Sequence, residues 1–416
     1  MFIALCGKPS VGKSTFFKAS TLADVKIANY PFTTLKSSEG MAFVKIDCID
    51  KEFNTRCNPQ HGYCVDSKRF VPIKLVDIPG LIEGSHKGLG MGNEFLNDIT
   101  QADALIHVID VSGSTNEKGE EVEKGSYNPS NDIKFLETEL DLWYHNILMK
   151  VWKTFARKAE MGNINFSEAV ARQFSGLKVK EEQVKKVLQE LNLSEKPSSW
   201  DDKQIMGFAS ALRKESKPMI IAANKIDTEK GRVNYEKLRA KFPNLSIVPC
   251  SADSELALRE AAKAKLIDYV PGDKDFKIIG KVNDSENEKF SGSESLKNTQ
   301  KLSGKQKQAL DKIRETVLEK FEYGTGVQQI LNSAVFDLLN YIAIFPASAN
   351  KLGDSKGNIL PDCFLLPKGS TALDFAYFLH TDFGENFIKA IDARTKRALG
   401  KAYELKHRDA LEIITR

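Results

Sequence analysis

The residue types best suited to chemistry lie near the start of the chain, in the segment Gly7-Lys-Pro-Ser-Val-Gly-Lys-Ser14. Two glycines separated by four residues and followed by Lys and Ser form the pattern of a phosphate-binding loop. Glycine lets the backbone wrap closely, so that successive N–H groups surround a phosphate, and the start of a following helix adds its positive end. Lys13 would contact the β- and γ-phosphates, and Ser14 would bind Mg²⁺. A merely structural turn is disfavoured, because an apolar run precedes the segment and a helical pattern follows it.

A second motif, Asp77-Ile-Pro-Gly80, follows another apolar run. Asp77 would hold Mg²⁺ through water, and the Gly80 N–H would meet the γ-phosphate and report its presence. The tetrapeptide alone is a weak signal, and its place after a predicted strand gives it weight. Many nucleotide switches continue with a Gln that orients the attacking water, but this chain has Leu81, which has no group for a hydrogen bond.

A third motif, Asn224-Lys-Ile-Asp227, suits the recognition of a guanine base. The Asp227 carboxylate could accept two hydrogen bonds from guanine, whereas adenine would leave a buried Asp227 with unmet acceptors. Asn224 would tie this loop to the phosphate-binding loop, and the stem of Lys225 would cover the base. The pair Ser251-Ala252 completes the set after the last predicted strand.

The elements that must position these motifs are five short apolar runs, Phe2–Cys6, Ile73–Val76, Ala104–Val111, Met219–Ala223 and Ile247–Cys250. Nearly continuous apolar runs of this length are typical of strands that are covered on both faces of a parallel sheet. Helical patterns follow some of them, at Lys13–Ala23 and Leu256–Ala264. This alternation predicts a doubly wound α/β fold, which binds its ligands at the carboxyl ends of the strands, where all the motifs lie.

The chain has 416 residues, enough for two or three domains. Residues 1–132 and 214–341 are predicted to form the two parts of the α/β domain, and helical periodicity predicts an inserted helical region at 133–213. The second part contains a polar, flexible loop at 282–307 and connecting helices at Ala309–Phe321 and Val327–Tyr341. Residues 342–416 mix strand and helix signals and are predicted to form a small separate domain.

Composition restricts the class of protein. The net charge of +4 is too small to indicate nucleic-acid binding by itself. Six scattered cysteines are not a disulfide framework and favour a reducing, cytoplasmic setting. The amino-terminal apolar run is too short for a signal peptide, and no run suits a membrane span, so no membrane association is expected.

Taken together, the motifs resemble those of the Obg-type translation-factor GTPases, and in particular the YchF-like branch in its archaeal and eukaryotic form. The matching segments are GKPSVGKST (7–15), ANYPFTTL (28–35), DIPGLIEG (77–84), NKID (224–227) and SA (251–252). The stretch LPKGSTALDFAYFLHTDFGENFIKAIDARTK (366–396) is similar to a TGS domain. The resemblance covers nearly the whole chain. It implies a P-loop NTPase fold with a helical insertion, a small ubiquitin-like α+β TGS domain, and GTP or GDP with Mg²⁺ as cofactors.

The resemblance also implies residue roles. Thr34 would reach Mg²⁺ in the triphosphate state, with Thr33 the less favoured choice, and an apolar residue such as Leu81 is usual for the family at its position. Ser10 stands where some relatives have an Asn linked to potassium-assisted hydrolysis, which puts that aid in doubt. The implied catalytic residues are Lys13, Thr34 and Gly80, and the implied metal ligands are Ser14, Thr34 and Asp77. The implied nucleotide-contacting residues are Gly7, Lys8, Pro9, Ser10, Val11, Gly12, Lys13, Ser14, Thr15, Asn224, Lys225, Asp227, Ser251 and Ala252.

Three substitutes for the missing Gln are open. Glu83 or His86 could orient water, an activating protein could supply the group, or Lys13, Mg²⁺ and backbone amides could suffice for slow hydrolysis. We rank the last two above the first. The resulting prediction is a slow GTPase switch associated with the ribosome or the translation machinery.

Two other functions stay open. Relatives with an altered base-reading motif prefer ATP, so an ATPase of the same architecture is one alternative, although the retained Asp227 favours GTP. The other is a nucleotide-sensing RNA- or ribosome-binding module with little catalytic role. A P-loop kinase is disfavoured, because its chemistry would give the Asn224–Asp227 motif no purpose.

Other residues have weaker signals. Cys48, Cys57, His61 and Cys64 could bind Zn²⁺, but their spacing matches no standard pair and an ordinary loop is favoured. The segment Lys389–Arg408 has seven basic and two acidic residues and suggests contact with ribosomal RNA, as do the basic helices around Lys150–Arg172. A solvated charged face is the alternative for both. The aromatic residues of the last region are predicted to lie in its core rather than to stack on bases; they are Phe364, Phe375, Tyr377, Phe378 and Phe383.

Overall fold

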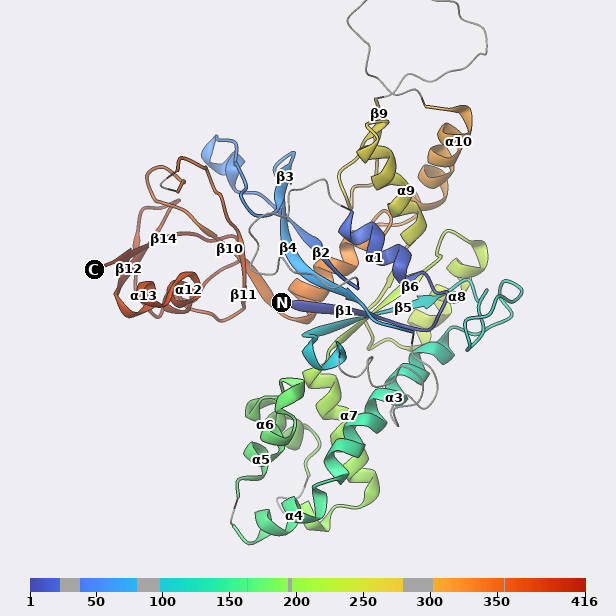
Figure 1. Cartoon of the computed structure of the whole chain (residues 1–416), viewed down its shortest axis with the longest axis vertical. Helices are drawn as coiled ribbons and strands as arrows, with labels where there is room; N and C mark the ends of the chain where they lie inside the picture. The colour runs from blue at the N-terminus through green and yellow to red at the C-terminus, as the bar shows by residue number, and fades with distance from the viewer. Residues whose placement is uncertain (23–37, 81–97, 163, 194–196, 280–301, 355) are drawn as a thin grey trace, which may run out of the picture. The chain divides into compact units, whose positions relative to one another are not determined.

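The computed structural model describes residues 1–22, 38–80, 98–162, 164–193, 197–279, 302–354 and 356–416 (Figure 1). These residues divide into two compact units. The first contains Met1–Leu22, residues 38–40 and the described part of Lys74–Ile330, and the second contains Met41–Ile73 and the described part of Leu331–Arg416. The association of Met41–Ile73 with the carboxyl-terminal region was not predicted.

The largest sheet has the strand order β2-β4-β1-β5-β6-β7, and β3 pairs with β4. Strand β1 pairs in parallel with β4 and β5, and β5-β6 and β6-β7 are also parallel, so the predicted α/β class is confirmed. Strand β2 was not predicted, because it starts with Glu-Gly-Met-Ala, residues with a weak preference for strands. The strands are β1 (Phe2–Cys6), β2 (Glu39–Asp47), β3 (Tyr63–Val65), β4 (Lys68–Asp77), β5 (Ala104–Asp110), β6 (Met219–Asn224) and β7 (Ile247–Pro249).

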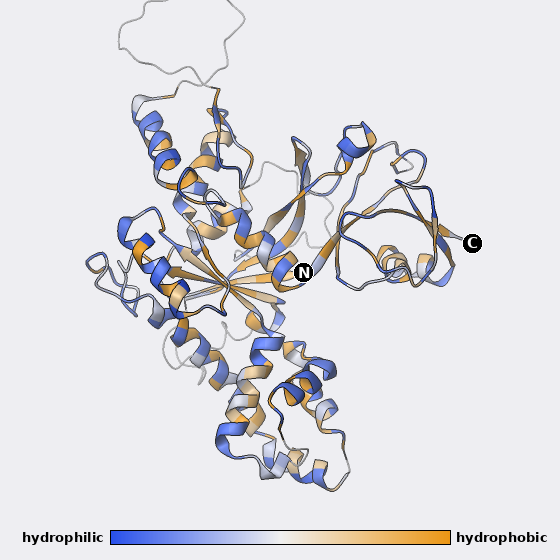
Figure 2. Cartoon of the chain, turned by 180° about the vertical axis from the view of Figure 1, so that it is seen from behind, coloured by the Kyte–Doolittle hydropathy of each residue, from blue (hydrophilic) through white to orange (hydrophobic). Residues whose placement is uncertain are grey.

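Helices cover the sheet of the first unit. Every residue of β5 is buried, and Figure 2 shows the central strands mostly orange between helices that carry blue residues. Helices α1 (Lys13–Thr21) and α9 (Ala252–Lys263) pack against each other, and α8 (Glu229–Lys241) follows β6. Parallel strands buried on both faces read as continuous apolar runs, which is why β1, β5 and β6 could be recognised.

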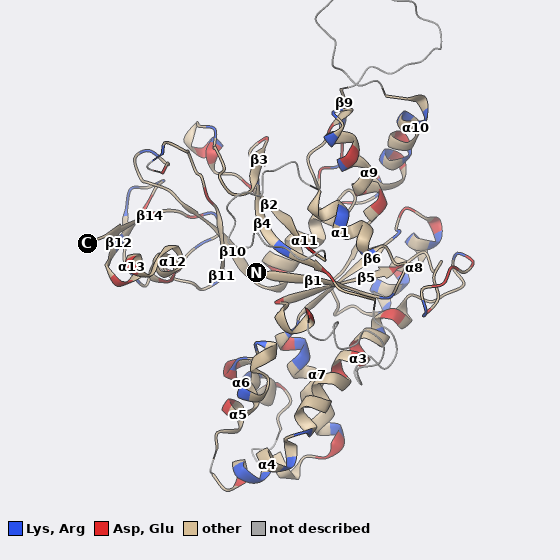
Figure 3. Cartoon of the chain, in the orientation of Figure 1, with Lys and Arg blue, Asp and Glu red and all other residues tan. Residues whose placement is uncertain are grey.

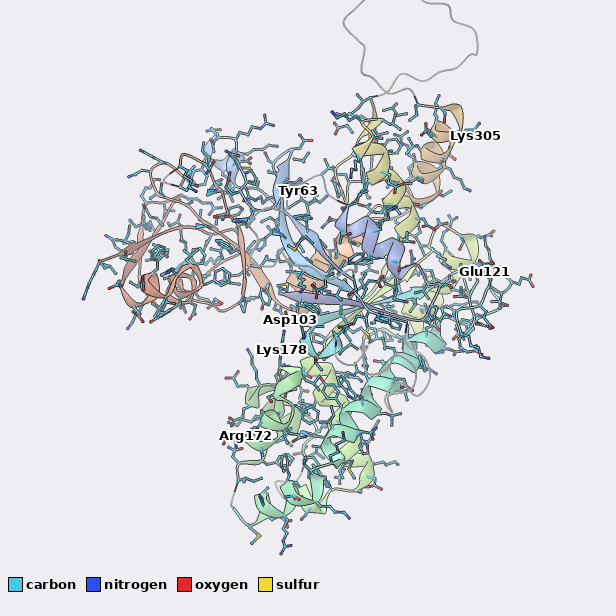
Figure 4. The ribbon with its side chains drawn as sticks, viewed as in Figure 1. Tyr63, Asp103, Glu121, Arg172, Lys178 and Lys305 are labelled. Atoms are coloured by element: carbon cyan, nitrogen blue, oxygen red, sulfur yellow. The ribbon has the colours of Figure 1, made fainter. Side chains whose placement is uncertain are left out.

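Five helices interrupt the alternation of strands and helices. They share one apolar core, in which Trp143, Trp152 and Phe208 are buried. An ion pair of 2.7 Å between Lys178 and Asp103 joins this region to the segment before β5, and Figure 4 shows both side chains. The helices are α3 (Ser130–Met149), α4 (Trp152–Glu160), α5 (Phe166–Gln173), α6 (Glu181–Glu190) and α7 (Asp202–Ser216).

The carboxyl-terminal sheet belongs to the second unit and has the order β11-β10-β14-β12-β13. Strands β10 and β14 are parallel, whereas the pairs β10-β11, β12-β13 and β12-β14 are antiparallel. Its core includes Ile344, Phe375 and Leu411. The elements are β10 (Tyr341–Pro346), β11 (Phe364–Pro367), α12 (Ala372–Leu379), α13 (Thr381–Glu385), β12 (Phe387–Asp392), β13 (Ala398–Leu399) and β14 (Ala410–Thr415).

Three expectations about local structure were wrong. Most of the predicted flexible loop at 282–307 lies outside the described residues, but its last residues are helical, because Ser303 caps α10 (Gly304–Ile313) by accepting a hydrogen bond from the Gln306 N–H. The helix expected to reach Tyr341 stops sooner: α11 (Val327–Asn332) continues as a wider turn to Leu338, and Asn340 then adopts a left-handed conformation. Three aromatic residues that were assigned to the last core are instead exposed, namely Tyr377, Phe378 and Phe383.

Short strands β8 (Ile267–Asp268) and β9 (Lys277–Ile278) form a separate pair. No described helix is long and apolar enough to cross a membrane.

Candidate functional site

The loop between β1 and α1 has the backbone of a phosphate cradle. Gly7 and Gly12 have φ angles of 141° and 94°, which L-residues with a side chain rarely adopt. A Cβ atom on Gly7 would lie 2.3 Å from the Val108 carbonyl oxygen, and one on Gly12 would lie 2.3 Å from Asn224 Nδ2. Both positions therefore require glycine, and the loop can wrap closely around a ligand.

Lys13 and Ser14 stand at the start of α1, where phosphate and metal would meet. Lys13 Nζ donates a 2.8 Å hydrogen bond to the Lys8 carbonyl, and burial lowers the pKa of Lys13 although the Asp77 charge opposes this. Ser14 Oγ donates to Asp77 Oδ2 at 2.8 Å. Asp77 Oδ1 is buried and has no hydrogen-bond partner among the described residues. A buried acceptor beside a hydroxyl suits a hydrated Mg²⁺, which favours oxygen ligands and keeps several waters.

Asn224 connects three loops of the site. Its Nδ2 donates to the Val11 carbonyl at 2.8 Å, and its Oδ1 accepts from the Ala252 N–H at 3.0 Å. Asn224 is 4% exposed, so these bonds are shielded from water. The structure thus brings three motifs of the sequence together at the carboxyl ends of β1, β6 and β7. They are the phosphate loop, the segment Asn224–Asp227 and the pair Ser251-Ala252.

Asp227 lies at the edge of this arrangement, in the turn before α8. Its Oδ1 accepts a 3.0 Å hydrogen bond from Ser251 Oγ. The Asp227 side chain is exposed, in contrast to the buried carboxylate of the sequence argument. The difference arises because Thr228 caps α8 directly after it and keeps Asp227 at the rim. The carboxylate is therefore accessible to a base.

Lys225 joins the rim of the site to the phosphate loop and also contacts Asp110, a residue that the sequence analysis missed. Its Nζ donates to the Ser10 carbonyl at 3.1 Å and to Asp110 Oδ2 at 3.0 Å. Asp110 is fully buried and also accepts from the hydroxyls of Ser112 and Ser114, at 2.5 and 2.8 Å. Burial raises the pKa of Asp110, but these hydrogen bonds outweigh burial and hold it below its usual value. The run of hydroxyl residues after β5 was the available signal.

Lys8 has a different surrounding from the one expected for a ligand-contacting side chain. Its Nζ donates to the Thr115 carbonyl at 2.9 Å, pairs with Asp132 at 3.0 Å and lies 3.8 Å above the Tyr127 ring. Burial lowers the pKa of Lys8, and the Asp132 charge partly offsets this. The Lys8 side chain is therefore committed to a buried cluster, and only its backbone is left for phosphate.

The switch residues are placed unevenly. Gly80 lies against the phosphate loop, since a Cβ atom there would be 3.0 Å from the Pro9 ring. Thr34 falls in residues 23–37, and Leu81, Glu83 and His86 fall in residues 81–97. Both segments lie outside the described residues.

In the second unit, part of the basic segment Lys389–Arg408 is engaged internally. Arg394 pairs with Glu52 at 2.7 Å, and Arg408 pairs with the same carboxylate. Lys389, Arg397 and Lys401 are exposed. A pocket of about 840 Å³ in this unit is lined by several positive side chains, including Lys45, Lys68, Lys368, Lys406 and Arg408.

The helical insertion offers a less uniform surface. Figure 3 shows basic and acidic residues interspersed along α4, α5 and α6. Some of them pair within the helix, as Arg172 does with Glu168 at 2.7 Å. Exposed pairs of this kind are usual on solvated helices.

Comparison with known proteins agrees with this arrangement. Three family models match in succession: "50S ribosome-binding GTPase" over residues 2–137, "Obg-like GTPase YGR210-like, G4 motif-containing domain" over 222–348, and "TGS domain" over 355–415. A GTP-binding protein of Methanocaldococcus jannaschii is 42% identical over 414 residues, which are 99% of this chain and 98% of that protein. A GTP-binding protein of Schizosaccharomyces pombe is 35% identical over 377 residues, which are 89% and 88% of the two chains.

Solved structures show the same fold. The crystal structure of a GTP binding protein from Pyrococcus horikoshii OT3 matches all of both chains with 34% identity and a TM-score of 0.75. The structure of the Schizosaccharomyces pombe YchF GTPase matches all of this chain and 97% of its own, with 19% identity and a TM-score of 0.58. Because relatives that are 34–42% identical extend over nearly its whole length, and the family models name an Obg-like GTPase and a TGS domain, the chain belongs to the Obg-like family of P-loop GTPases with a carboxyl-terminal TGS domain.

Proposed function

We propose that this GTPase is a slow molecular switch, which binds GTP and GDP with Mg²⁺ and associates with the ribosome or translation machinery of the cytoplasm according to the bound nucleotide. The observation that carries the proposal is the bridge made by Asn224, whose amide joins the phosphate loop at Val11 to the base loop at Ala252. This bridge holds a phosphate site and a base site at a fixed separation, as one nucleotide requires.

Different residues of the site would bind the phosphates and the metal ion. Backbone N–H groups of residues 10–15 would bind the β-phosphate, while Lys13 would exchange its bond to the Lys8 carbonyl for one to the β- and γ-phosphates. Ser14 and Thr34 would bind Mg²⁺ directly, and Asp77 would hold it through water. The metal supplies positive charge that neutralises the phosphate oxygens as the γ-phosphoryl group leaves. The Gly80 N–H would donate a hydrogen bond to the γ-phosphate. Loss of the γ-phosphate after hydrolysis would remove this bond and release the segment that follows Gly80.

Guanine preference would come from Asp227, whose exposed carboxylate is held in place by Ser251. Bound guanine would offer it two N–H donors, and adenine would desolvate it without providing them. An ATPase of the same architecture is the alternative, and the nucleotide preference of wild type and Asp227→Ala separates the two.

Slow hydrolysis follows from Leu81, which cannot orient water. Lys13, Mg²⁺ and backbone amides would support a basal rate, and an activating protein would raise it. Alanine at Glu83 or His86 should therefore leave basal hydrolysis nearly unchanged. Loss of hydrolysis with intact nucleotide binding would instead assign the missing role to one of these two residues.

For partner binding, we propose that residues 1–132 and 214–341 form the G domain, 133–213 its insertion and 342–416 the TGS domain. Exposed Lys389, Arg397 and Lys401 could contact phosphates of ribosomal RNA, and exposed Tyr377 and Phe378 could stack on unpaired bases. The name of the matching family, "50S ribosome-binding GTPase", supports a ribosomal partner. A nucleotide-sensing ribosome-binding module with little catalysis is the remaining alternative.

Co-sedimentation with ribosomes tests the proposal, using full-length protein with a non-hydrolysable GTP analogue, with GDP and without nucleotide. We expect the analogue to increase binding and the alanine triple variant of Lys389, Arg397 and Lys401 to weaken it and reduce its salt dependence. The matched control removes three exposed charges of the first unit, Lys305, Lys312 and Lys320. Equal binding in all three nucleotide states would contradict the switch, and equal weakening by both triple variants would contradict the proposed surface.

A further inference from the structure

Three cysteines and one aspartate of the second unit gather into a compact cluster. Cys48 follows β2, Asp50 starts the short 3₁₀ turn Asp50–Phe53, Cys57 lies in the next loop and Cys64 is in β3. One potential ligand atom from each lies within 4.8 Å of all the others. Four side chains that are far apart along a 17-residue stretch thus converge on one point, which is the arrangement of a closed metal site.

This cluster differs in one member from the candidate set Cys48, Cys57, His61 and Cys64, for which the sequence favoured an ordinary loop. His61 does not belong to the cluster, since its Nδ1 pairs with Asp362. Asp50 takes the fourth place, and sequence reasoning passed over it because acidic residues are common in exposed turns. Here, however, Asp50 is only 3% exposed.

The distances fit a metal better than a disulfide. Cys48 Sγ and Cys57 Sγ are 3.7 Å apart, far from the ~2.05 Å of a sulfur–sulfur bond. Zinc–thiolate bonds of ~2.3 Å directed to the corners of a tetrahedron place two sulfurs about 3.8 Å apart. The observed spacing therefore allows both sulfurs to bind one zinc ion.

The electrostatic surroundings also favour a cation. A buried carboxylate beside three sulfur groups is costly unless it is compensated. Asp50 Oδ1 accepts a 2.8 Å hydrogen bond from the Lys51 N–H, and the lone pairs of the carboxylate leave acceptor capacity for a metal.

We propose that Cys48, Asp50, Cys57 and Cys64 bind one Zn²⁺ ion in a tetrahedral structural site. Thiolates select zinc over Mg²⁺ or Ca²⁺, which take oxygen ligands. Each thiol releases its proton to solvent as it binds the metal. Four protein ligands leave no open position for a substrate, so the site would stabilise structure rather than perform catalysis.

The site would fix a loop that anchors the carboxyl-terminal part of its unit. Within this loop, the Asn58 N–H donates to the Ile359 carbonyl and the Gln60 N–H to the Pro361 carbonyl, each at 2.8 Å. Glu52, two residues beyond Asp50, pairs with two arginines of the carboxyl-terminal region. Removal of the metal should therefore destabilise the second unit and leave the nucleotide site of the first unit intact.

Elemental analysis of full-length protein, purified under reducing conditions without chelator, tests the proposal. We expect one zinc per chain in wild type and a loss of most of it in Cys57→Ser and Cys64→Ser. The matched control is Cys363→Ser, which alters another buried cysteine of the same unit that lies outside the cluster. Cys363→Ser and His61→Ala should retain zinc, and Asp50→Ala should bind it more weakly than wild type.

A second measurement does not depend on the folding of variants. Zinc-free wild type titrated with Co²⁺ should develop the thiolate-to-cobalt charge-transfer band and the intense visible bands of a tetrahedral ion, saturating at one equivalent. The proposal would be overturned if wild type contained no zinc as purified and showed none of these bands with Co²⁺. A Cys48–Cys57 disulfide in protein purified under reducing conditions would also overturn it. Loss of zinc in Cys363→Ser with full retention in Asp50→Ala would overturn the assignment of Asp50.

Discussion

Replacing Asn224 by alanine removes the bridge between the phosphate loop and the base loop. The Val11 carbonyl and the Ala252 N–H would lose their partners, and both residues are almost fully buried. A buried polar group without a partner costs about 1–3 kcal/mol, so the two together cost about 2–6 kcal/mol. Asn224→Ala should therefore lower the stability of the first unit and raise the Kd for GTP.

The size of the effect on affinity follows from the same numbers. If the cost acts on the arrangement of the two loops, the competent arrangement becomes less populated and the apparent Kd rises accordingly. The lower end of the range, about 2 kcal/mol, corresponds to a rise of about 30-fold. Fluorescence titration with a labelled GTP analogue measures the Kd, and thermal unfolding measures the stability.

Two further variants make the test specific. Asn224→Asp keeps an acceptor for the Ala252 N–H but places a second oxygen against the Val11 carbonyl, so it should act in the same direction. Asn165→Ala removes a helix cap of α5, where Oδ1 accepts from the Glu168 N–H, and should cost about 1 kcal/mol of stability without affecting the Kd. A Kd of Asn224→Ala within about threefold of wild type, with unchanged unfolding, would refute the reasoning.

Three other outcomes are expected. Gly12→Ala should abolish nucleotide binding, because the new Cβ would lie 2.3 Å from Asn224 Nδ2 at a φ angle of 94°; measurable binding of GTP would contradict the rigid cradle. Ser14→Ala should remove most of the gain in GTP affinity that Mg²⁺ gives, measured by titration with Mg²⁺ or with a chelator, and an unchanged gain would exclude Ser14 as a ligand. Burial lowers the pKa of His107 from 6.5 to about 3, so its unfolded form binds a proton first as the pH falls, and stability is lost below pH 6.5. Between pH 6.5 and 5 the unfolding free energy of wild type should fall by about 2 kcal/mol for this reason, and His107→Gln should not show this fall in urea unfolding. Parallel pH profiles of the two proteins would contradict the role of His107.

Much of the fold was predictable because its signals are local. Strands β1, β5 and β6 are buried on both faces and are almost purely apolar, whereas β2 contains Gly and Ala and gives no such signal. The phosphate loop was recognisable because Gly7 and Gly12 each occupy a backbone position that only glycine tolerates.

The parts of the site that could not be predicted depend on long-range contacts. Lys8 turns away from the phosphate region because of Asp132, a partner on α3 that no local pattern reveals. Asp110 resembled an ordinary strand end, and its role emerged only with the hydroxyl groups and Lys225 that surround it. The same limit applied to Asp50, whose burial beside the cysteines depends on the folded loop.

The most direct test of the central claim is the equilibrium binding of GTP, GDP, ATP and ADP, each with Mg²⁺, to wild type and to Asp227→Ala. We predict a strong preference of wild type for guanine nucleotides and its collapse in the variant, because the carboxylate held by Ser251 is the group proposed to read the base. Equal or tighter binding of ATP, unchanged by the substitution, would contradict the account and place the protein with the ATPases of its family.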